Sequence, residues 1–256
     1  MKVKTALVTG ASSGIGAVFA RHLAQAGYRV TCVARSTNKL ESLIQELGAD
    51  HRVLVADLAD PAQLERVVQD VENSGYSLVV NNAGFGLYGR FEELPIEQQE
   101  ELMFVNMNAL VRISHAFLKK AATGDALINV SSALSLLTYP GGAVYAGSKA
   151  FVTNFTESLW YENKDRGVMV MALLPGITES NFHARATGDR IKAGPSGMSY
   201  PPETVVREAL AALKARRKPS LISGRLYRFL TFLNTRLMSR KKMVTIMGQN
   251  SAGLKK

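Results

Sequence analysis

Seven short apolar runs, rich in β-branched residues, alternate along this chain with longer segments of helical periodicity. The runs occupy residues 5–9, 29–34, 52–56, 78–81, 126–130, 168–174 and 220–223. The helical segments lie near residues 14–26, 37–47, 61–73, 97–120, 145–166 and 202–217. Strands buried on both faces have such continuous apolar sequences, and helices that alternate with strands form crossovers between parallel strands. The sequence therefore predicts an α/β fold with a single doubly wound parallel sheet and helices on both faces.

A glycine-rich stretch, TGASSGIG at residues 9–16, follows the first predicted strand and opens the first predicted helix. Its glycines allow a tight turn and a close approach of backbone to a pyrophosphate, and the helix N-terminus offers unpaired N–H groups. A purely structural turn is the alternative. The strand-turn-helix context favours a dinucleotide site in a Rossmann-type sheet. The predicted phosphate-binding residues are Gly10, Ser12, Ser13, Gly14, Ile15 and Gly16.

The residues after the second and third strands predict which dinucleotide binds. An NAD-binding sheet usually carries Asp or Glu at the end of its second strand, where the carboxylate holds the ribose 2′-hydroxyl. Ala34 and Arg35 stand there instead. Because a guanidinium can pair with a 2′-phosphate, the sequence favours NADP(H), with a solvated surface arginine as the alternative. Asp57, after the third strand, can accept a hydrogen bond from an adenine amino group or flank a helix.

Small and polar residues also follow the next three strands, at the sheet edge where ligands of open α/β sheets bind. NNAG at 81–84 places Asn82, Ala83 and Gly84 against a cofactor channel or within a turn. NVSS at 129–132 ends the fifth strand. LLPG at 173–176 stops the sixth strand, so Pro175 and Gly176 are expected beside a nicotinamide.

YAGSK, at residues 145–149, places Tyr145 and Lys149 one helical turn apart. By spacing alone this is typical of a surface helix pair. Behind a dinucleotide loop and the NVSS serines, it indicates a proton-transfer site instead.

The joint pattern resembles the short-chain dehydrogenases/reductases. TGASSGIG, NNAG, VNMN, NVSS, YAGSK and PG occur in the order and approximate spacing of that family, and the resemblance covers residues 3–215. It implies a nicotinamide cofactor and a catalytic group of Asn106, Ser132, Tyr145 and Lys149. Ser132 is favoured over Ser131 by its separation from the tyrosine.

The resemblance carries three further expectations. Asn106 is favoured over Asn108 as the catalytic asparagine, and it is expected to hold backbone or water in a proton relay leading from the lysine. The family's threonine after PG falls on Thr178 or on Ser180, and Thr178 is the predicted cofactor contact. The family commonly forms homodimers or homotetramers through the long helices near 97–120 and 145–166. Basic, leucine-rich tails like this one occur in a bacterial subset of its reductases.

The expected reaction is hydride transfer between the nicotinamide and a hydrophobic carbonyl or alcohol. Reduction creates an alkoxide that needs a proton, which Tyr145 can supply. An unperturbed phenol has a pKa of about 10, and a nearby Lys149 ammonium is expected to lower it. Ser132 is expected to orient the substrate oxygen.

Apolar side chains beyond the strand ends predict the substrate pocket. They suggest a hydrophobic carbonyl compound, a class that includes fatty-acyl and other lipid-like carbonyls. The predicted substrate residues are Phe85, Leu134, Tyr139 and Phe182, accompanied by Leu87, Val144 and Met198. The polar, glycine-containing segment 177–202 leaves the same edge and is expected to act as a lid rather than a passive loop.

The basic charge of the chain is confined to its C-terminal part. Residues 1–213 carry 19 basic and 21 acidic side chains, whereas residues 214–256 carry 12 basic and no acidic ones. We expect a catalytic, dinucleotide-binding domain over 1–223 and a basic amphipathic extension over 224–256. Over 224–242 the helical spacing places Leu226, Phe229, Leu230, Leu233 and Leu237 on one face. That face can dock on its own domain, join a subunit interface or lie on anionic lipid.

Several classes of function are disfavoured by the sequence. Cys32 is the only cysteine, its apolar neighbours predict a buried strand thiol, and the N-terminus lacks a secretion signal, so a cytoplasmic protein, peripheral to membranes at most, is expected. The four histidines lack metal-ligand spacing, and a nucleic-acid module is absent. The competing hypothesis is a non-catalytic NADP(H)-binding regulator or scaffold that uses the basic tail to reach a partner or a membrane surface.

Overall fold

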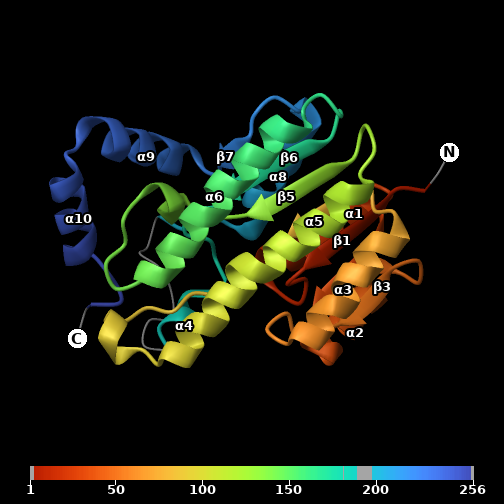
Figure 1. Cartoon of the computed structure of the whole chain (residues 1–256), viewed down its shortest axis with the longest axis horizontal. Helices are drawn as coiled ribbons and strands as arrows, with labels where there is room; N and C mark the ends of the chain where they lie inside the picture. The colour runs from red at the N-terminus through yellow and green to blue at the C-terminus, as the bar shows by residue number, and fades with distance from the viewer. Residues whose placement is uncertain (1–2, 181, 189–197, 255–256) are drawn as a thin grey trace.

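The computed structural model describes residues 3–180, 182–188 and 198–254 and contains one seven-stranded sheet (Figure 1). The strands are β1 (Thr5–Thr9), β2 (Arg29–Ala34), β3 (Arg52–Val55), β4 (Leu78–Asn81), β5 (Ala126–Val130), β6 (Met169–Leu174) and β7 (Ser220–Ile222). Their order is β3-β2-β1-β4-β5-β6-β7, and each neighbouring pair is parallel. The predicted doubly wound parallel sheet is confirmed. Its direction of winding reverses between β1 and β4, where such folds bind ligands.

Helices cover both faces of this sheet. One face packs against α1 (Gly14–Gln25), α2 (Thr37–Leu47) and α8 (Pro202–Ala215). The other packs against α3 (Pro61–Ser74) and α5 (Leu110–Lys120), and beside them α6 (Ala143–Asn163) crosses β5 and β6. In Figure 1, α5 and α6 run across the front of the molecule. Shorter segments connect these elements: α4 (Ile96–Met103), α7 (Phe182–Ala186), and the 3-10 turns Phe91–Glu93 and Ala133–Leu136.

Alternate side chains of the strands fill the two cores. Leu7 and Leu127 point toward α3 and α5, whereas Val8 and Ile128 point toward α1 and α8, and all four are fully buried. Burying each such side chain contributes about 1.5–3 kcal/mol, which explains why the strands are apolar on both faces. Cys32 is likewise fully buried, and this burial raises the pKa of its thiol to about 12. The interpretation of Cys32 as a buried strand thiol is confirmed.

The helix predicted over 97–120 is interrupted by a π-helical turn, Phe104–Ala109, between α4 and α5. Such turns are rare and often lie at functional sites. This one contains Asn106, whose side chain is fully buried. Periodicity alone does not reveal the extra residue that a π turn inserts.

The segment after β7 forms two helices rather than one. The first, α9 (Arg225–Leu237), ends at Met238, whose extended backbone breaks the helix. The second, α10 (Arg240–Gln249), begins after Ser239, whose hydroxyl accepts a hydrogen bond from the Lys242 N–H at 3.3 Å. Figure 1 shows both helices at the end of the molecule toward which β5 points. Among the described residues, we find no helix with the length and apolarity required to cross a bilayer.

Candidate active site

A cleft of about 1020 Å³ lies at the carboxyl ends of the strands. Its walls include residues that follow each of the strands β1 to β6, as expected for a ligand site of a doubly wound sheet. Nearly all predicted site residues line it: Gly10, Ser12, Ser13, Gly14, Ile15, Arg35, Asp57, Asn82, Ala83, Gly84, Phe85, Ser132, Leu134, Tyr139, Tyr145, Lys149, Pro175, Gly176, Thr178 and Phe182. Gly16 and Asn106 do not line it, and both lie directly behind it.

The glycine loop after β1 is closely packed. Gly10 and Gly14 have φ values of +65° and +54°, which favour glycine. A Cβ on Gly16 would lie 2.3 Å from the carbonyl oxygen of Gly10, so only glycine lets α1 start this close to the loop. The N-terminal N–H groups of α1 then face the cleft, an arrangement suited to a phosphate.

The end of β4 holds this loop in place. The Thr9 hydroxyl accepts from the N–H groups of Asn82 at 3.0 Å and Ala83 at 2.9 Å. In return, the Asn82 amide nitrogen donates to the Thr9 carbonyl at 2.9 Å. The asparagine therefore acts on the loop backbone, and the NNAG segment both shapes the glycine loop and lines the cleft.

Basic side chains mark one end of the cleft, after β2 and β3. Arg35 Nη1 lies 3.6 Å from Asp57 Oδ2, and both side chains are exposed, so the pair itself adds little to stability. Lys39, in the first turn of α2, also lines this end and was not predicted. The sequence feature that could have identified Lys39 is its position as a second cation four residues after Arg35.

Ser131 and Ser132, which follow β5, differ in their hydrogen bonds. The Ser131 hydroxyl donates to the Lys149 carbonyl at 2.8 Å and contacts Thr153 Oγ1 at 2.7 Å, so it is committed to α6. The Ser132 hydroxyl accepts from the Leu134 N–H at 3.2 Å and lies against the Tyr145 side chain. The Ser132 hydroxyl can therefore donate a hydrogen bond to Tyr145 or to a molecule in the cleft. This supports the choice of Ser132 over Ser131 as the serine of the site.

Tyr145 and Lys149 lie on the first turns of α6 and are only 6% and 5% exposed. The ammonium of Lys149 donates to the Val130 carbonyl at 3.0 Å and lies 5.9 Å from the centroid of the Tyr145 ring. Tyr88 and Phe182 pack against the same ring, at centroid distances of 5.8 and 5.5 Å. The Tyr145 ring thus lies among aromatic neighbours and close to a buried cation.

The pKa of the tyrosine shifts in the direction opposite to the one expected from its sequence neighbours. Burial raises the pKa of Tyr145 to about 12, although the hydrogen bond with Ser132 lowers it. Burial lowers the pKa of Lys149 to about 8. Desolvation is the largest cause of both shifts, and the ammonium donates its hydrogen bond to the Val130 carbonyl.

Asn106 connects the π-helical turn to the floor of the cleft. Its Oδ1 accepts from the Phe85 N–H at 3.1 Å, and its Nδ2 donates to the Phe85 carbonyl at 3.0 Å and to the Ser148 hydroxyl at 3.2 Å. A Cβ on Gly84 would lie 2.8 Å from Asn106 Oδ1 and 3.3 Å from Lys149 Nζ. Asn106 therefore positions the Phe85 backbone beside the lysine, and glycine at 84 leaves space between them.

The segment after β6 closes the other end of the cleft. The Thr178 hydroxyl donates to the Gly176 carbonyl at 3.1 Å, and the Ser180 hydroxyl donates to the Thr178 carbonyl at 3.4 Å. Both residues line the cleft. The predicted lid, 177–202, is described only in part, since residues 181 and 189–197 lie outside the described residues.

The C-terminal extension supplies part of the wall of the cleft, which the sequence did not reveal. Its lining residues are Tyr227, Leu230, Thr231 and Asn234 of α9, followed by Met247, Asn250 and Ala252. Tyr139, a predicted substrate residue, is tied to this extension because its hydroxyl accepts from the Ala252 N–H at 3.2 Å. The predicted residue Met198 also lines the cleft.

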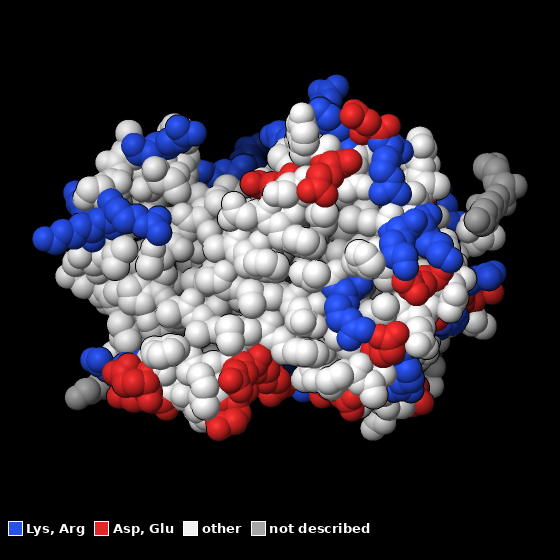
Figure 2. Space-filling view, viewed as in Figure 1, with Lys and Arg blue, Asp and Glu red and all other residues white. Residues whose placement is uncertain are grey.

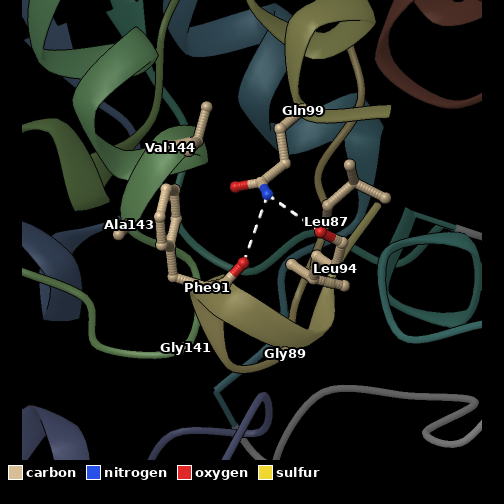
Figure 3. Close-up of a pocket in the computed structure, with 8 residues that line it drawn as sticks. All are labelled: Leu87, Gly89, Phe91, Leu94, Gln99, Gly141, Ala143 and Val144. Atoms are coloured by element: carbon tan, nitrogen blue, oxygen red, sulfur yellow. Dashed lines mark hydrogen bonds between the residues drawn. The ribbon is translucent and has the colours of Figure 1, made fainter. Parts of the chain in front are cut away.

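Leu87 and Val144, also expected in the substrate pocket, line a separate small cavity (Figure 3). Gln99 reaches into it and donates from Nε2 to the carbonyls of Phe91 at 3.2 Å and Leu94 at 3.1 Å. The cavity measures about 30 Å³, which is too small for a substrate. The Gln99 amide at its edge satisfies carbonyls of the turn that precedes α4.

Metal binding finds no support in the described part of the chain, where the acidic, cysteine and histidine side chains form no cluster of three. His51 has a structural role, since its Nδ1 accepts from the Val30 N–H at 3.0 Å.

Comparisons with known proteins agree with this site. Residues 4–190 match the family model described as short chain dehydrogenase. The chain is 33% identical to the 3-oxoacyl-acyl-carrier-protein reductase of Escherichia coli over 75% of this chain and 80% of that protein. It is 32% identical to sulfoacetaldehyde reductase 2 of Chromohalobacter salexigens over 71% and 75%. A short-chain dehydrogenase of Sphingobium yanoikuyae, solved with NADPH, is 29% identical, with a TM-score of 0.77 over 86% and 87%. The chain therefore belongs to the short-chain dehydrogenase family, and it is an oxidoreductase of CH–OH and C=O groups.

Proposed function

We propose that this protein is an NADP(H)-dependent oxidoreductase that interconverts a hydrophobic carbonyl compound and its alcohol, with Tyr145 as general acid and base. One observation carries the proposal. A buried tyrosine hydroxyl, bonded to Ser132 and backed by the Lys149 ammonium, opens into the same cleft as the glycine loop.

The residues of the cleft fit NADP(H). Only glycine is accommodated at positions 10 and 16, which leaves the loop backbone open to a pyrophosphate. Arg35 and Lys39 provide two cations for a 2′-phosphate, and a carboxylate that would hold a 2′-hydroxyl is absent from the end of β2. Pro175, Gly176 and Thr178 would hold the nicotinamide side. When bound, NADPH supplies the hydride.

The side chains of the site can donate and accept the proton of the reaction. With a pKa of about 12, Tyr145 is protonated at neutral pH and ready to donate to the alkoxide as it forms. Ser132 can donate a second hydrogen bond to that oxygen and fix its position. Donation leaves a buried tyrosinate, and the Lys149 ammonium is the cation placed to stabilise it. In the direction of alcohol oxidation, the same groups accept the proton.

The substrate class is inferred from the walls beside Tyr145. Phe85, Tyr88, Tyr139 and Phe182 present aromatic surface around the catalytic hydroxyl. Aromatic walls of this kind favour a substrate that has a hydrophobic body attached to its carbonyl. The two reductases named above act on an oxoacyl group and on sulfoacetaldehyde. Because relatives of similar identity have such different substrates, we infer the substrate class from the pocket and not from the family.

We also expect the enzyme to form a homo-oligomer through α5 and α6. Figure 2 shows a broad area free of charged side chains across the middle of the face where these helices run. Phe151 and Phe155 of α6 stack at 5.6 Å, and Phe151 is 41% exposed. Such an uncharged area is typical of a subunit interface.

A consumption assay for NADPH over a panel of aldehydes, ketones and 3-oxoacyl thioesters tests the function. We expect turnover of hydrophobic members, and loss of turnover without loss of NADPH binding in Tyr145→Phe. Tight NADPH binding with no turnover anywhere in the panel would instead favour the non-catalytic regulator. Near-normal turnover by Tyr145→Phe would refute the role of the tyrosine.

A further inference from the structure

Helix α9 has two different faces, and one of them belongs to the cleft. Tyr227, Leu230, Thr231 and Asn234 line the cleft at positions i, i+3, i+4 and i+7 of the helix. Residues at this spacing share one face. Thr231 at its centre is only 4% exposed. The packed face is thus centred on a threonine and not on the leucine stripe that the sequence suggested.

The opposite face of α9 is apolar and lies in solvent. We define the outer face of α9 as Arg225, Leu226, Phe229, Phe232, Arg236 and Leu237. Phe229, Phe232 and Leu237 are 62%, 60% and 70% exposed. Leaving two phenylalanines and a leucine this exposed on one short helix is unfavourable unless something covers them.

Unpaired positive charge surrounds these apolar side chains. Arg225 and Arg236 are exposed on the outer face, and the first turn of α10 adds exposed Arg240, Lys241 and Lys242. None of these five cations forms an ion pair with any residue that the structure describes. In Figure 2, the charged side chains over α9 and α10 are blue. The partner of this surface must therefore be both apolar and negatively charged.

We propose that the outer face of α9, together with the first turn of α10, binds the surface of an anionic lipid bilayer. A helix with aromatic and leucine side chains on one face and basic groups at its margins lies in the interface, where the apolar groups enter the acyl region and the cations meet lipid phosphates. Because the inner face of the same helix lines the cleft, a single helix about 10 Å thick separates the cleft from the lipid.

The attachment of α9 to the domain is firm enough to fix this orientation. The Glu208 carboxylate of α8 accepts from the Gly224 N–H at 3.0 Å and from Arg228 at 3.2 Å. The Tyr227 hydroxyl donates to the Met198 carbonyl at 3.0 Å. Arg228 thus anchors the helix and is not part of the outer face.

A second copy of the chain fits the outer face of α9 less well than a lipid surface does. A two-fold interface through the outer face would place the same patch on both subunits, so each set of cations would face its own copy. Residues 214–256 contain no acidic side chain that could relieve this repulsion. Lipid phosphates supply the missing negative charge.

Co-sedimentation of the full-length protein with vesicles tests the proposal without any turnover. We expect binding to vesicles rich in phosphatidylglycerol, weak binding to pure phosphatidylcholine, and weakening by salt. Phe229→Ser combined with Phe232→Ser should reduce the partition coefficient by about tenfold or more, because it removes the apolar anchor. The matched control, Phe91→Ser with Ile96→Ser, removes two side chains that are 58% and 53% exposed elsewhere and should bind like the wild type.

Two outcomes would overturn the proposal. One is equal vesicle binding by the wild type and the Phe229/Phe232 variant while both retain the wild-type unfolding midpoint. The other is no vesicle binding by the wild type together with dissociation of a lipid-free oligomer in that variant, measured by sedimentation equilibrium, which would assign the outer face to a second copy. Because neither measurement uses NADPH, the result is independent of the proposed reaction.

Discussion

The ring of Tyr227 rests on the backbone of Gly176, at the point where β6 ends beside the catalytic cleft. A Cβ on Gly176 would lie 2.1 Å from Cδ2 of the tyrosine, well inside van der Waals contact. This contact joins the segment after β6 to α9, and both line the cleft. The C-terminal extension is therefore packed directly against the segment that follows the sheet.

Gly176→Ala should displace the Tyr227 ring and destabilise the fold by about 1–3 kcal/mol, since overpacking at a rigid contact forces backbone shifts. Adding Tyr227→Ala should recover part of that loss, because the double variant no longer contains the clash. Urea unfolding of the four proteins of this cycle measures the coupling. Gly147→Ala, where a Cβ meets nothing within 4 Å, is the matched control and should not destabilise. Strict additivity of the two changes would show that the contact is unimportant.

Lys149→Met should raise the free energy of unfolding near neutral pH while abolishing efficient turnover. Burial lowers the pKa of Lys149 from 10.5 to about 8, which corresponds to roughly 3 kcal/mol of cost for the buried ammonium. Losing the hydrogen bond to the Val130 carbonyl offsets about 1 kcal/mol of this, so a net gain of about 2 kcal/mol is expected.

The pH dependence of that gain has a defined sign. Between the folded pKa of about 8 and the unfolded value of 10.5, the unfolded wild type binds more protons than the folded one, so wild-type stability rises with pH. The advantage of Lys149→Met should therefore be constant below about pH 8 and shrink as the pH approaches 10.5. Chemical denaturation of both proteins from neutral pH to pH 10.5 measures this stability difference. A gap that widens above pH 8 would contradict the burial of a titrating lysine.

Arg35→Asp should shift the cofactor preference from NADPH toward NADH. The change removes one cation from the 2′-phosphate end and places a second carboxylate near Asp57, which lies 3.6 Å from the present guanidinium. Loss of a charged hydrogen bond predicts a fall of about tenfold to hundredfold in kcat/KM for NADPH. Lys39→Ala should give a smaller fall in the same direction. Lys120→Asp, an equal change of charge at the exposed end of α5, is the control, and unchanged ratios of the two cofactors in Arg35→Asp would refute the assignment.

Asn106→Ala should destabilise the protein by about 3 kcal/mol, because both backbone groups of Phe85 and the Ser148 hydroxyl lose a buried partner. The exposed Asn154→Ala, which loses only a bond to the Ala150 carbonyl, should cost far less. As a positioning role predicts, kcat should fall while the Kd for NADPH changes little. A thermal unfolding midpoint equal to that of Asn154→Ala would rule out this role.

The parallel sheet could be predicted because its determinants are local. Each strand is an apolar run long enough to identify, and chemistry in such a sheet lies where the strands end. Gly10, Arg35, Asn82 and Ser132 each sit at such an end or on the first turn beyond it, so sequence order alone brings them to one cleft. Tyr145 comes later, in the first turn of α6, and its motif rather than its distance from a strand identified it.

The remaining features depend on tertiary packing. The leucine stripe of α9 left open whether it docks on its own domain, joins a subunit interface or lies on lipid. The structure packs the face that carries Tyr227 and Thr231 against the cleft. The pKa of Tyr145 depends on how deeply α6 is buried, and a tyrosine–lysine spacing contains no information about burial. The π turn at Asn106 is likewise fixed by its bonds to Phe85, a residue 21 positions away.

The position of α9 in the chain sets the order in which the cleft is made. All seven strands, the glycine loop and Tyr145 precede residue 225, so they leave the ribosome before the helix that supplies Tyr227, Thr231 and Asn234. Because domains fold from the N-terminus during synthesis, the nascent sheet can bind its dinucleotide before one wall of the substrate site exists. A chain that ended after β7 would therefore keep the glycine loop and Tyr145 but lack the wall of the cleft that α9 provides.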